Sequence, residues 1–395
     1  MKIYQVGGSV RDEILDTLPS DRDFVVVGAT VDEFLKKFPK AIKVGRSFPV
    51  FLVDGNEYAF ARKEKKISAG YRGFDVEFSP DITLEEDLAR RDITINSIAK
   101  DVETGEIIDP FNGINDIRAK RIVHVTKAFS EDPLRVYRVA RFAARFCDFF
   151  VDEKTIELMN SLKGELDTLS VERVWAECLK AMESTCPSRF FKILREAEVL
   201  DIHFPELFEL IDVPAGPVEF HGDEKDSFDH TMKAIKRTPR DPVLVFSVLC
   251  HDLGKALTPK EIYPHHYSHD TNGVEPVKAL CKRLKVPKKY ERSAFLTARY
   301  HMTLSRLPEM RPGKAVNLLR KLDGFEPAGI FGFLKIIQAD SGQDTDKLEE
   351  FIERVLPSIR EKLPEEFWNQ GVKSTEILNE MMIKKYVELK KRGEK

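Results

Sequence analysis

The periodicity of the chain changes once, near residue 133, and this change limits the folds that are open to it. Before it, short apolar runs bounded by turn residues predict strands: KIYQVGG at 2–8, DFVVVG at 23–28 and FPVFLVDGNEYAFAR at 48–62. The last run contains Asp54-Gly55, a dipeptide typical of a hairpin turn. After residue 133, apolar residues recur at helical spacing. The pattern predicts an α+β fold, in which an N-terminal mixed sheet with helices precedes entirely helical regions.

Composition excludes some locations and partners. The chain has 395 residues, of which 42% are hydrophobic and 33% charged, and no apolar run approaches the ~20 residues that span a bilayer. The N-terminus lacks the apolar stretch of a signal peptide. We therefore expect a cytoplasmic protein without membrane contact, present as a monomer or homodimer. Five cysteines, an odd number without C-x-x-C spacing, are expected to be reduced and mostly buried.

A glycine pair, an arginine and two aspartates lie close together in VGGSVRDEILDTLPSDRDFVVVG, residues 6–28. Asp21 and Asp23 precede an apolar strand, and strand side chains two apart point the same way. Mg²⁺ suits such paired carboxylates, because it takes hard oxygen ligands and keeps positions open for phosphates. Gly8 lets a helix N-terminus approach a phosphate, and Arg11 would hold the same group. Either motif alone is more often only a turn, but together they predict a nucleotide site.

Five motifs follow one another in one order: GGSVRD, DRD, LARRDITINSIA, IIDPFNG and EDPLRVYRVARF. In this order they resemble the class II tRNA nucleotidyltransferases, the CCA-adding enzymes, and their relatives the bacterial poly(A) polymerases. The resemblance implies a head like that of DNA polymerase β, in which Asp21 and Asp23 are catalytic ligands of Mg²⁺. It implies that a set of glycine and arginine residues holds the nucleotide: Gly8, Arg11, Arg91, Arg138 and Arg141. It also implies a flexible loop at residues 63–81, and it assigns no third metal carboxylate.

The motif E-D-P-L-R predicts how bases are selected. Asp132 and Arg135 lie three apart near a helix start and can share a face. A carboxylate only accepts hydrogen bonds and a guanidinium only donates them. Cytosine and adenine both present an amine beside a ring acceptor, whereas guanine and uracil present a carbonyl beside an N–H. The pair therefore predicts a site that accepts CTP and ATP. The helical stripe of Arg135, Arg138, Arg141 and Arg145 is either part of this site or a solvated basic face.

A second constellation lies downstream, where six of the nine histidines fall between residues 230 and 301. The order H…HD…H…H…D resembles that of the HD-domain phosphohydrolases. The resemblance implies a metal site made of His230, His251, Asp252 and Asp340. His269 and His301 would be additional ligands or phosphate contacts, and Lys255 would help to neutralise phosphate. Imidazole ligands favour a transition metal such as Ni²⁺. The alternative is a hydrogen-bonded His-Asp pair with exposed histidines around it.

Together these motifs predict four regions. They are a nucleotidyltransferase head at 1–125, a helical neck and body at 126–215, an HD domain at 216–345 and a basic helical tail at 346–395. The resemblance implies a CCA-adding enzyme that acts on the tRNA 3′ end and contacts the acceptor stem and T-arm. It also implies phosphatase, 2′-nucleotidase and 2′,3′-cyclic phosphodiesterase activities in the HD domain. The alternatives are a poly(A) polymerase, an enzyme that adds only CC or only A, and an HD phosphohydrolase with a nucleotide-sensing head.

Overall fold

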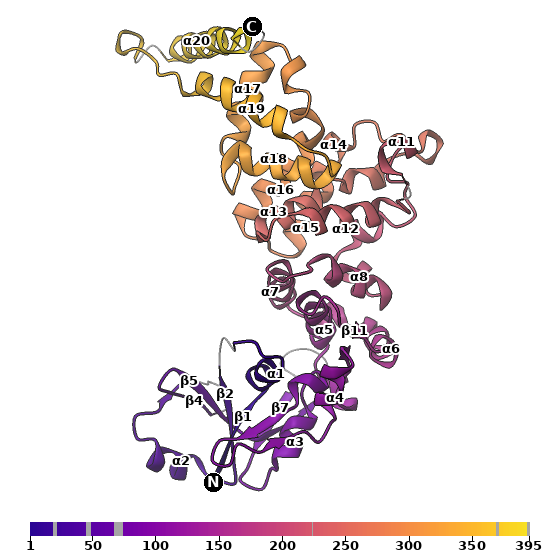
Figure 1. Ribbon diagram of the computed structural model, residues 1–395, viewed down its shortest axis with the longest axis vertical. Coiled ribbons are helices and arrows are strands. Elements are labelled where there is room, and N and C mark those ends of the chain that lie inside the picture. The colour runs from indigo at the N-terminus through magenta and orange to yellow at the C-terminus, as the bar shows by residue number, and fades with distance from the viewer. Residues whose placement is uncertain (19–21, 45–48, 67–73, 223, 369–370, 393–395) are drawn as a thin grey trace. The chain divides into compact units, whose positions relative to one another are not determined.

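The computed structural model describes residues 1–18, 22–44, 49–66, 74–222, 224–368 and 371–392. These residues form two compact units, Met1–His203 and Phe204–Lys395 (Figure 1). Among the described residues, every strand lies in the first unit, and the second unit is helical. The predicted α+β fold is therefore confirmed, whereas the division into four regions stays a prediction.

A mixed sheet of seven strands forms the base of the first unit. Its order is β3-β4-β5-β2-β1-β8-β9. The strands are β1 (Lys2–Val6), β2 (Asp23–Val27), β3 (Ile42–Lys43), β4 (Val50–Val53), β5 (Asn56–Phe60), β8 (Ala99–Asp101) and β9 (Ile107–Ile108). The predicted hairpin is confirmed, since β4 and β5 pair on either side of Asp54-Gly55. Strands β2 and β5 run parallel in a register that sets Asp23 opposite Glu57.

The sheet is buried on both faces. Successive residues of a strand point to opposite faces, and in β2 Val25 and Val26 enter two different cores. Val26 packs with Phe34 of α2 (Val31–Lys37), and Val25 belongs to the cluster that holds Leu88 of α3 (Leu84–Ala89). Two further short helices are α1 (Gly8–Ile14) and α4 (Gly113–Arg118). This double burial explains the unbroken apolar run FVVV.

The flexible loop expected at residues 63–81 is largely a two-stranded ribbon. Strands β6 (Arg62–Lys66) and β7 (Phe74–Phe78) pair antiparallel, with Lys63 opposite Glu77. Opposite charges that face each other across a ladder stabilise it, and composition alone does not show this pairing. The expectation of a loop was therefore wrong for these strands, and residues 67–73 lie outside the described residues.

Helices complete the first unit. They are α5 (Arg135–Arg145), α6 (Glu153–Ser161), α7 (Val171–Met182), α8 (Ser188–Glu196) and α9 (Leu200–His203), together with the short parallel pair β10 (Arg121–Ile122) and β11 (Phe150–Val151). Helix α5 packs against α7 and α8. Its side chains Val136, Val139, Ala140 and Ala143 are fully buried, as the predicted stripe requires. The arginines of α5 therefore lie on its other face.

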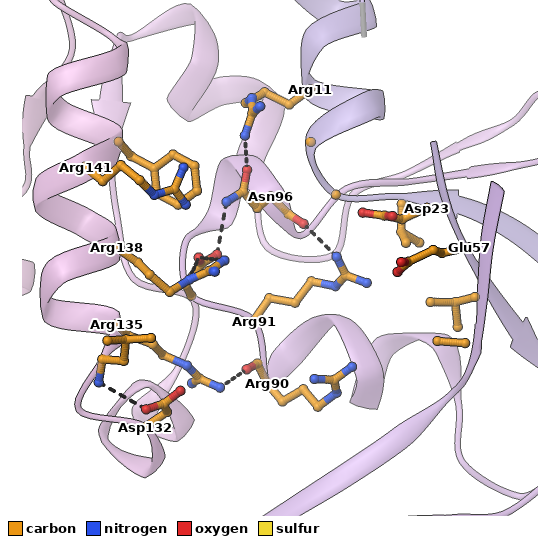
Figure 2. A pocket seen from close by; sticks show the side chains of 18 of the residues that line it. Arg11, Asp23, Glu57, Arg90, Arg91, Asn96, Asp132, Arg135, Arg138 and Arg141 are labelled. Carbon is orange, nitrogen blue, oxygen red and sulfur yellow. Dashed lines mark hydrogen bonds and ion pairs between the residues drawn. The ribbon is translucent and has the colours of Figure 1, made fainter. Parts of the chain in front are cut away.

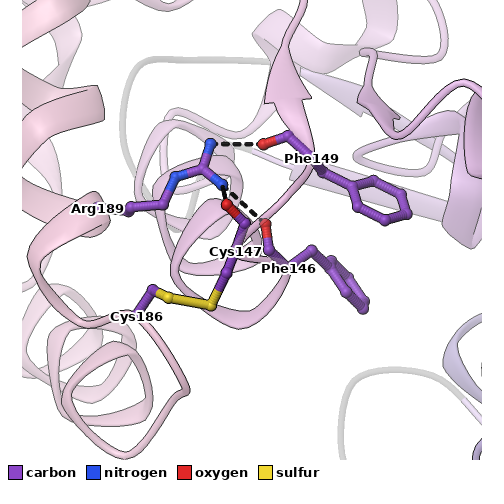
Figure 3. The surroundings of a disulfide bond; sticks show 5 residues. All are labelled: Phe146, Cys147, Phe149, Cys186 and Arg189. Atoms are coloured by element: carbon purple, nitrogen blue, oxygen red, sulfur yellow. Dashed lines mark hydrogen bonds between the residues drawn. A yellow bond between two sulfur atoms is a disulfide. The ribbon is translucent and has the colours of Figure 1, made fainter.

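Two cysteines correct the expectation of reduced thiols. Cys147 and Cys186 form a disulfide bond (Figure 3). Cys147 follows α5 and Cys186 precedes α8, and the packing of these helices brings their Cα atoms to 5.7 Å. The two residues are 39 apart in sequence, so no spacing motif indicates the pair. The other three cysteines are free and buried, as expected: Cys178, Cys250 and Cys281.

The second unit consists of α10 (Pro205–Phe208), α11 (Val218–His221), α12 (Ser227–Arg237), α13 (Pro242–Cys250), α14 (His269–Asn272), α15 (Val274–Arg283), α16 (Lys288–Leu304), α17 (Pro312–Leu322), α18 (Gly329–Ser341), α19 (Asp346–Val355) and α20 (Val372–Lys391). Helix α13 is apolar on all sides, and α12, α16 and α18 pack around it. His251 and Asp252 follow α13 directly, so this buried helix places a polar pair inside the unit. None of the helices in the described ranges is long and apolar enough to cross a bilayer.

Candidate active sites

The first unit contains a pocket of about 580 Å³ between the sheet and helix α5 (Figure 2). Nine arginines and four carboxylates line it, so the pocket favours a polyanion such as a triphosphate. All the described residues that the sequence singled out for the nucleotide site lie in its wall: Gly8, Arg11, Asp23, Arg91, Asp132, Arg135, Arg138 and Arg141. Asp21 lies outside the described residues.

Asp23 has a carboxylate neighbour that the sequence did not indicate. Glu57 is its register partner on the parallel strand β5, and Figure 2 shows the two side chains next to each other at the pocket wall. Two carboxylates on adjacent strands supply the hard oxygen ligands that Mg²⁺ requires. The donor set therefore fits a magnesium ion, and Glu57 is a candidate for the third metal carboxylate.

The glycine pair allows arginine side chains to approach the backbone at the start of α1. Gly7 has a positive φ of 74°, and a Cβ there would lie 2.9 Å from a guanidinium nitrogen of Arg91. A Cβ on Gly8 would lie 3.2 Å from a guanidinium nitrogen of Arg11. The pair therefore does more than turn the chain, because any larger residue would displace these two arginines.

Arg11 is part of a buried network. Its guanidinium is 2% exposed, donates to Asp12 Oδ1 at 2.8 and 3.0 Å and also donates to Asn96 Oδ1. Its charge lies 5.0 Å from the centre of the Phe146 ring. Burial lowers the pKa of Arg11, although Asp12 opposes the shift. Arg145 reaches the other oxygen of Asp12 at 3.0 Å, so α1 and α5 share one carboxylate.

Asp92 fixes the position of the Arg138 side chain, as Asp12 fixes that of Arg11. Its Oδ2 accepts from Nε and Nη2 of Arg138 at 2.8 and 2.5 Å, and its Oδ1 accepts from the Asn96 amide at 3.0 Å. Burial alone raises the pKa of Asp92, but the Arg138 charge and these hydrogen bonds hold that pKa well below its usual value. Asp92 is therefore an anion that orients Arg138 toward the pocket, a role that the sequence did not indicate.

The remaining arginines also have carboxylate or carbonyl partners. Arg141 donates to Glu177 of α7 at 2.5 Å and lies 4.2 Å from the centre of the Phe142 ring. Arg135 donates to the backbone carbonyls of Ala128 and Arg90 at 2.6 and 2.5 Å. The arginine stripe is thus a preorganised wall of the pocket, and the alternative of a solvated basic face is wrong.

Asp132 makes contacts that the sequence motif did not predict. Its Oδ2 accepts from Arg173 of α7 at 2.9 Å, and its Oδ1 accepts from the backbone N–H of Leu134 at 3.1 Å. Arg135 begins α5, whereas Asp132 precedes the helix in extended conformation. Both side chains line the pocket, but Asp132 does so from extended backbone and Arg135 from the first turn of a helix.

Asp87 anchors Arg90 and Arg91 of the LARRDITINSIA motif, and its replacement by asparagine should destabilise the first unit by about 2–3 kcal/mol. Its fully buried carboxylate accepts from Arg90 at 2.7 and 3.0 Å and from Arg91 at 3.3 Å. Burial raises the pKa of Asp87, but both arginines lower it to a net value below the usual one. The difference in the free energy of unfolding between this variant and wild type should therefore be largest at neutral pH. It should become smaller as acid protonates Asp87 in the wild-type protein.

Urea unfolding followed by tryptophan fluorescence measures this effect. The chain has one tryptophan in each unit, Trp175 and Trp368, so a Trp368→Phe background reports the first unit alone. Glu85→Gln, an exposed change on the same helix, should leave the free energy of unfolding within about 0.5 kcal/mol of wild type. Equal stability of the Asp87 and Glu85 variants would contradict the anchoring role.

The second unit brings together the predicted HD residues. Nε2 of His230 lies 3.3 Å from Nε2 of His251 and 2.9 Å from Oδ1 of Asp340. Asp252 Oδ2 lies 3.0 Å from His251 Nε2 and 3.5 Å from His230 Nε2. Ligand atoms bound to one metal ion at ~2.0–2.2 Å lie about 2.8–3.1 Å apart in octahedral geometry and about 3.3–3.6 Å apart in tetrahedral geometry. These four residues therefore have the spacing of a metal site.

The accessory residues lie on the other side of Asp252. Its Oδ1 is 3.4 Å from His269 Nε2 and 3.6 Å from His301 Nε2, and the two histidine nitrogens are 3.2 Å apart. Lys255 lies 2.6 Å from Asp252 Oδ2 and also donates to the carbonyl of Ala215. The alternative of exposed histidines is wrong for this group, because each of the four histidines is at most 8% exposed.

Burial and charge act in opposite directions on this group. Burial alone lowers the pKa of His251, but Asp252 and Asp340 raise it to about 10. Burial raises the pKa of Asp252, yet His251 and Lys255 hold it well below its usual value. The carboxylates are thus anionic, and His251 and Lys255 beside them supply positive charge. The chemistry of the donor set, imidazole with carboxylate, fits a transition metal.

Comparison with known proteins identifies the family. Over 411 aligned residues the chain is 41% identical to the "Multifunctional CCA protein" of Pasteurella multocida, which covers 99% of this chain and 97% of the relative. The chain belongs to this family. The family member of Mannheimia succiniciproducens is 47% identical over 337 residues, covering 82% of this chain and 79% of that protein.

Family models and solved structures agree with the fold of a multifunctional CCA protein. Residues 3–123 match the Poly A polymerase head domain, and residues 148–211 match the "Probable RNA and SrmB- binding site of polymerase A". A CCA-adding enzyme in apo form II has a TM-score of 0.68 at 22% identity, covering 98% of this chain and 88% of that one. The Thermotoga maritima CCA-adding enzyme, solved with tRNA, has a TM-score of 0.65 at 21% identity, covering 99% and 90%. At this identity the likeness shows a shared fold.

Proposed function

We propose that this protein is a CCA-adding tRNA nucleotidyltransferase, which adds C, C and A to tRNA 3′ ends from CTP and ATP without a nucleic-acid template. The observation that carries the proposal is the pocket of the first unit, where Asp23 and Glu57 face a wall of arginines. Relatives named multifunctional CCA proteins support it across nearly the whole chain. The partners are then CTP, ATP and the 3′ end, acceptor stem and T-arm of tRNA.

In this proposal the two walls of the pocket have different tasks. Asp23, Glu57 and Asp21 would hold Mg²⁺, which when bound activates the 3′-hydroxyl and stabilises the departing pyrophosphate. Arg11, Arg91, Arg138 and Arg141, with the backbone at Gly8, would bind and orient the nucleotide. Because each of these arginines is already held by a partner on the protein, little side-chain freedom is lost when the nucleotide binds.

Base selection would depend on Asp132 and Arg135. A carboxylate has about four acceptor sites, so the contacts of Asp132 with Arg173 and with the N–H of Leu134 leave room for the amine of cytosine or adenine. Arg135 is held in the pocket wall by two backbone carbonyls, which fixes its position for the ring acceptor. Guanine and uracil would set a carbonyl against the Asp132 carboxylate and an N–H against the Arg135 guanidinium, so neither residue would hydrogen-bond to the base.

Asp132→Ala should relax the choice of base. The wild-type preference for CTP over UTP should fall about 5–150-fold, since each unpaired buried group costs ~1–3 kcal/mol. Single-turnover incorporation of each nucleotide into a tRNA lacking CCA measures the ratio. Asp167→Ala, a change at an exposed position in the same unit, is the control and should keep the ratio. A variant that slows all nucleotides equally would show that Asp132 positions the nucleotide without reading the base.

Primer extension tests the activity itself. Purified protein with Mg²⁺ and tRNA transcripts lacking CCA is offered CTP, ATP, both together, GTP or UTP. Growth by two C and one A, followed by arrest, is the expected result. A long A tail with ATP alone would indicate a poly(A) polymerase, and growth by only CC or only A would indicate a partial enzyme. No extension in any mixture would leave the second unit as the only active centre.

We infer that the second unit is an HD phosphohydrolase with phosphatase, 2′-nucleotidase and 2′,3′-cyclic phosphodiesterase activity. The imidazole nitrogens and carboxylate oxygens that gather around Asp252 carry this inference. His230, His251, Asp252 and Asp340 would hold the metal ion, which when bound polarises the phosphate and activates water. His269 and His301 would add ligands or contact phosphate, and Lys255 would neutralise phosphate charge. Hydrolysis of 2′,3′-cyclic AMP with added Ni²⁺, Co²⁺, Mn²⁺ or Mg²⁺ tests it.

A further inference from the structure

Glu224 lies beside the histidine group, although the HD sequence pattern does not include it. Its Oε2 is 2.9 Å from Nδ1 of His230 and 3.0 Å from Nδ1 of His221. An ionised carboxylate only accepts hydrogen bonds, so both Nδ1 atoms donate to it. The Glu224 side chain is only 8% exposed, and its other oxygen lies 3.7 Å from the ammonium group of Lys233. Glu224 is therefore a fixed group that links two histidine rings.

The ring of His230 is held differently from the other rings of the group. Nδ1 of His251 lies 2.6 Å from the Val248 carbonyl, and Nδ1 of His269 lies 2.7 Å from the His266 carbonyl. Nδ1 of His301 lies 3.0 Å from the Thr297 carbonyl. Each of these rings thus donates from Nδ1 to the backbone, and its Nε2 atom lies 3.0–3.6 Å from a carboxylate oxygen of Asp252. For His230 a carboxylate takes the place of the carbonyl.

The contact with Glu224 determines what His230 presents to the centre of the group. Because Nδ1 donates to Glu224, Nε2 is the ring atom that faces the centre of the group, 2.9 Å from Asp340 Oδ1 and 3.3 Å from His251 Nε2. A metal ion bound there would take the lone pair of this nitrogen. A carboxylate that accepts from the outer nitrogen orients a metal-binding imidazole, fixes its tautomer and makes it a stronger ligand. The His221 ring packs edge-on against His230, with centroids 4.9 Å apart, and limits its rotation.

We propose that Glu224 is a positioning residue of the metal centre, which orients His230 for metal binding and is itself held by His221. The proposal rests on the phosphohydrolase inferred above, because it assigns Glu224 to the support of one ligand of that site. It also accounts for a buried glutamate with two histidine partners that the nucleotidyltransferase activity does not use. Removal of such a supporting carboxylate typically weakens metal binding about 10–100-fold.

The test compares Co²⁺ binding by the full chain and its variants, measured by competition with a chromophoric chelator. Glu224→Ala should bind Co²⁺ about 10–100-fold more weakly than wild type, with an altered visible Co²⁺ spectrum. Glu224→Gln keeps an acceptor for His230 and should recover part of the affinity. Glu219→Ala is the matched control, because Glu219 is exposed on the neighbouring helix α11. It should bind like wild type.

The outcomes separate this role from the activity that it supports. A Glu224→Ala variant with wild-type affinity and spectrum would overturn the positioning role, even if the wild-type protein binds Co²⁺ and hydrolyses cyclic phosphate. An equal loss in Glu219→Ala would also overturn it, since the effect would then belong to the fold of this segment. Wild-type protein that binds no metal ion would instead overturn the phosphohydrolase itself. Thermal unfolding of each variant without metal shows that the unit remains folded.

Discussion

Asp23→Asn is expected to lower kcat for CMP addition at least about 10³-fold, because a magnesium ion at this site contributes several kcal/mol to the transition state. Asparagine has the shape of aspartate but lacks the charge that the metal requires. The residue is exposed at the start of β2, so the fold should not change. Primer extension at saturating CTP and Mg²⁺ measures kcat, and hydrolysis of 2′,3′-cyclic AMP by the same sample should be unaltered.

Two companion variants sharpen this experiment. Asp54→Asn replaces an exposed carboxylate in the β4–β5 turn of the same sheet and should keep wild-type kcat. Glu57→Gln should lose activity as Asp23→Asn does if Glu57 is the third metal carboxylate, since the two residues are register partners. Full activity of Asp23→Asn would remove the basis for a metal site in the pocket. If only Glu57→Gln keeps full activity, only the assignment of Glu57 as the third metal carboxylate would be removed.

Local patterns predicted four strands of the sheet, but the pairing of strands far apart in sequence determined the site. The strands at 2–6 and 23–27 and the hairpin around Asp54 follow from apolar runs and a turn dipeptide, signals that act over a few residues. The neighbouring positions of Asp23 and Glu57 depend on the parallel pairing of β2 with β5. No periodicity within either strand contains that information, so Glu57 was not found.

The arginine stripe of α5 was also predicted only in part, because its partners come from distant segments of the chain. Helical spacing predicted which residues of α5 share a face, and the structure places Arg138 and Arg141 in the pocket. Their partners Asp92 and Glu177 come from other segments. Whether an arginine face is solvated or buried in ion pairs depends on these partners. Composition therefore could not decide between a surface helix and a pocket wall.

The disulfide and the β6–β7 ribbon were not predicted because both depend on contacts that no local sequence pattern contains. Cys147 and Cys186 meet because α5 and α8 pack together, which the spacing of the cysteines does not express. Strand β6, RKEKK, has no apolar residue, so it resembles a loop until its pairing with β7 is known. In contrast, the order of histidines and aspartates in the second unit is a pattern spread over the sequence, and the structure brings its members together.

Asp340→Asn should lower the hydrolysis of cyclic phosphate and leave CCA addition unchanged, the reverse of the result expected for Asp23→Asn. We expect hydrolysis of 2′,3′-cyclic AMP to fall more than about 10²-fold, because the anionic oxygen 2.9 Å from His230 Nε2 becomes a neutral amide and metal binding weakens. The Asp340 side chain is 20% exposed at the edge of the group, so the substitution should not leave a deeply buried charge unpaired.

The matched control is Asp344→Asn, an exposed change four residues further along the chain, which should keep wild-type hydrolysis. CCA addition by both variants should equal that of wild type, because the pocket lined by Asp23 belongs to the other compact unit. Loss of both activities in Asp340→Asn would show that the two centres depend on each other. Unchanged hydrolysis would show that the histidine group has a structural role, and the metal-dependent activity would then have to be sought elsewhere on the chain.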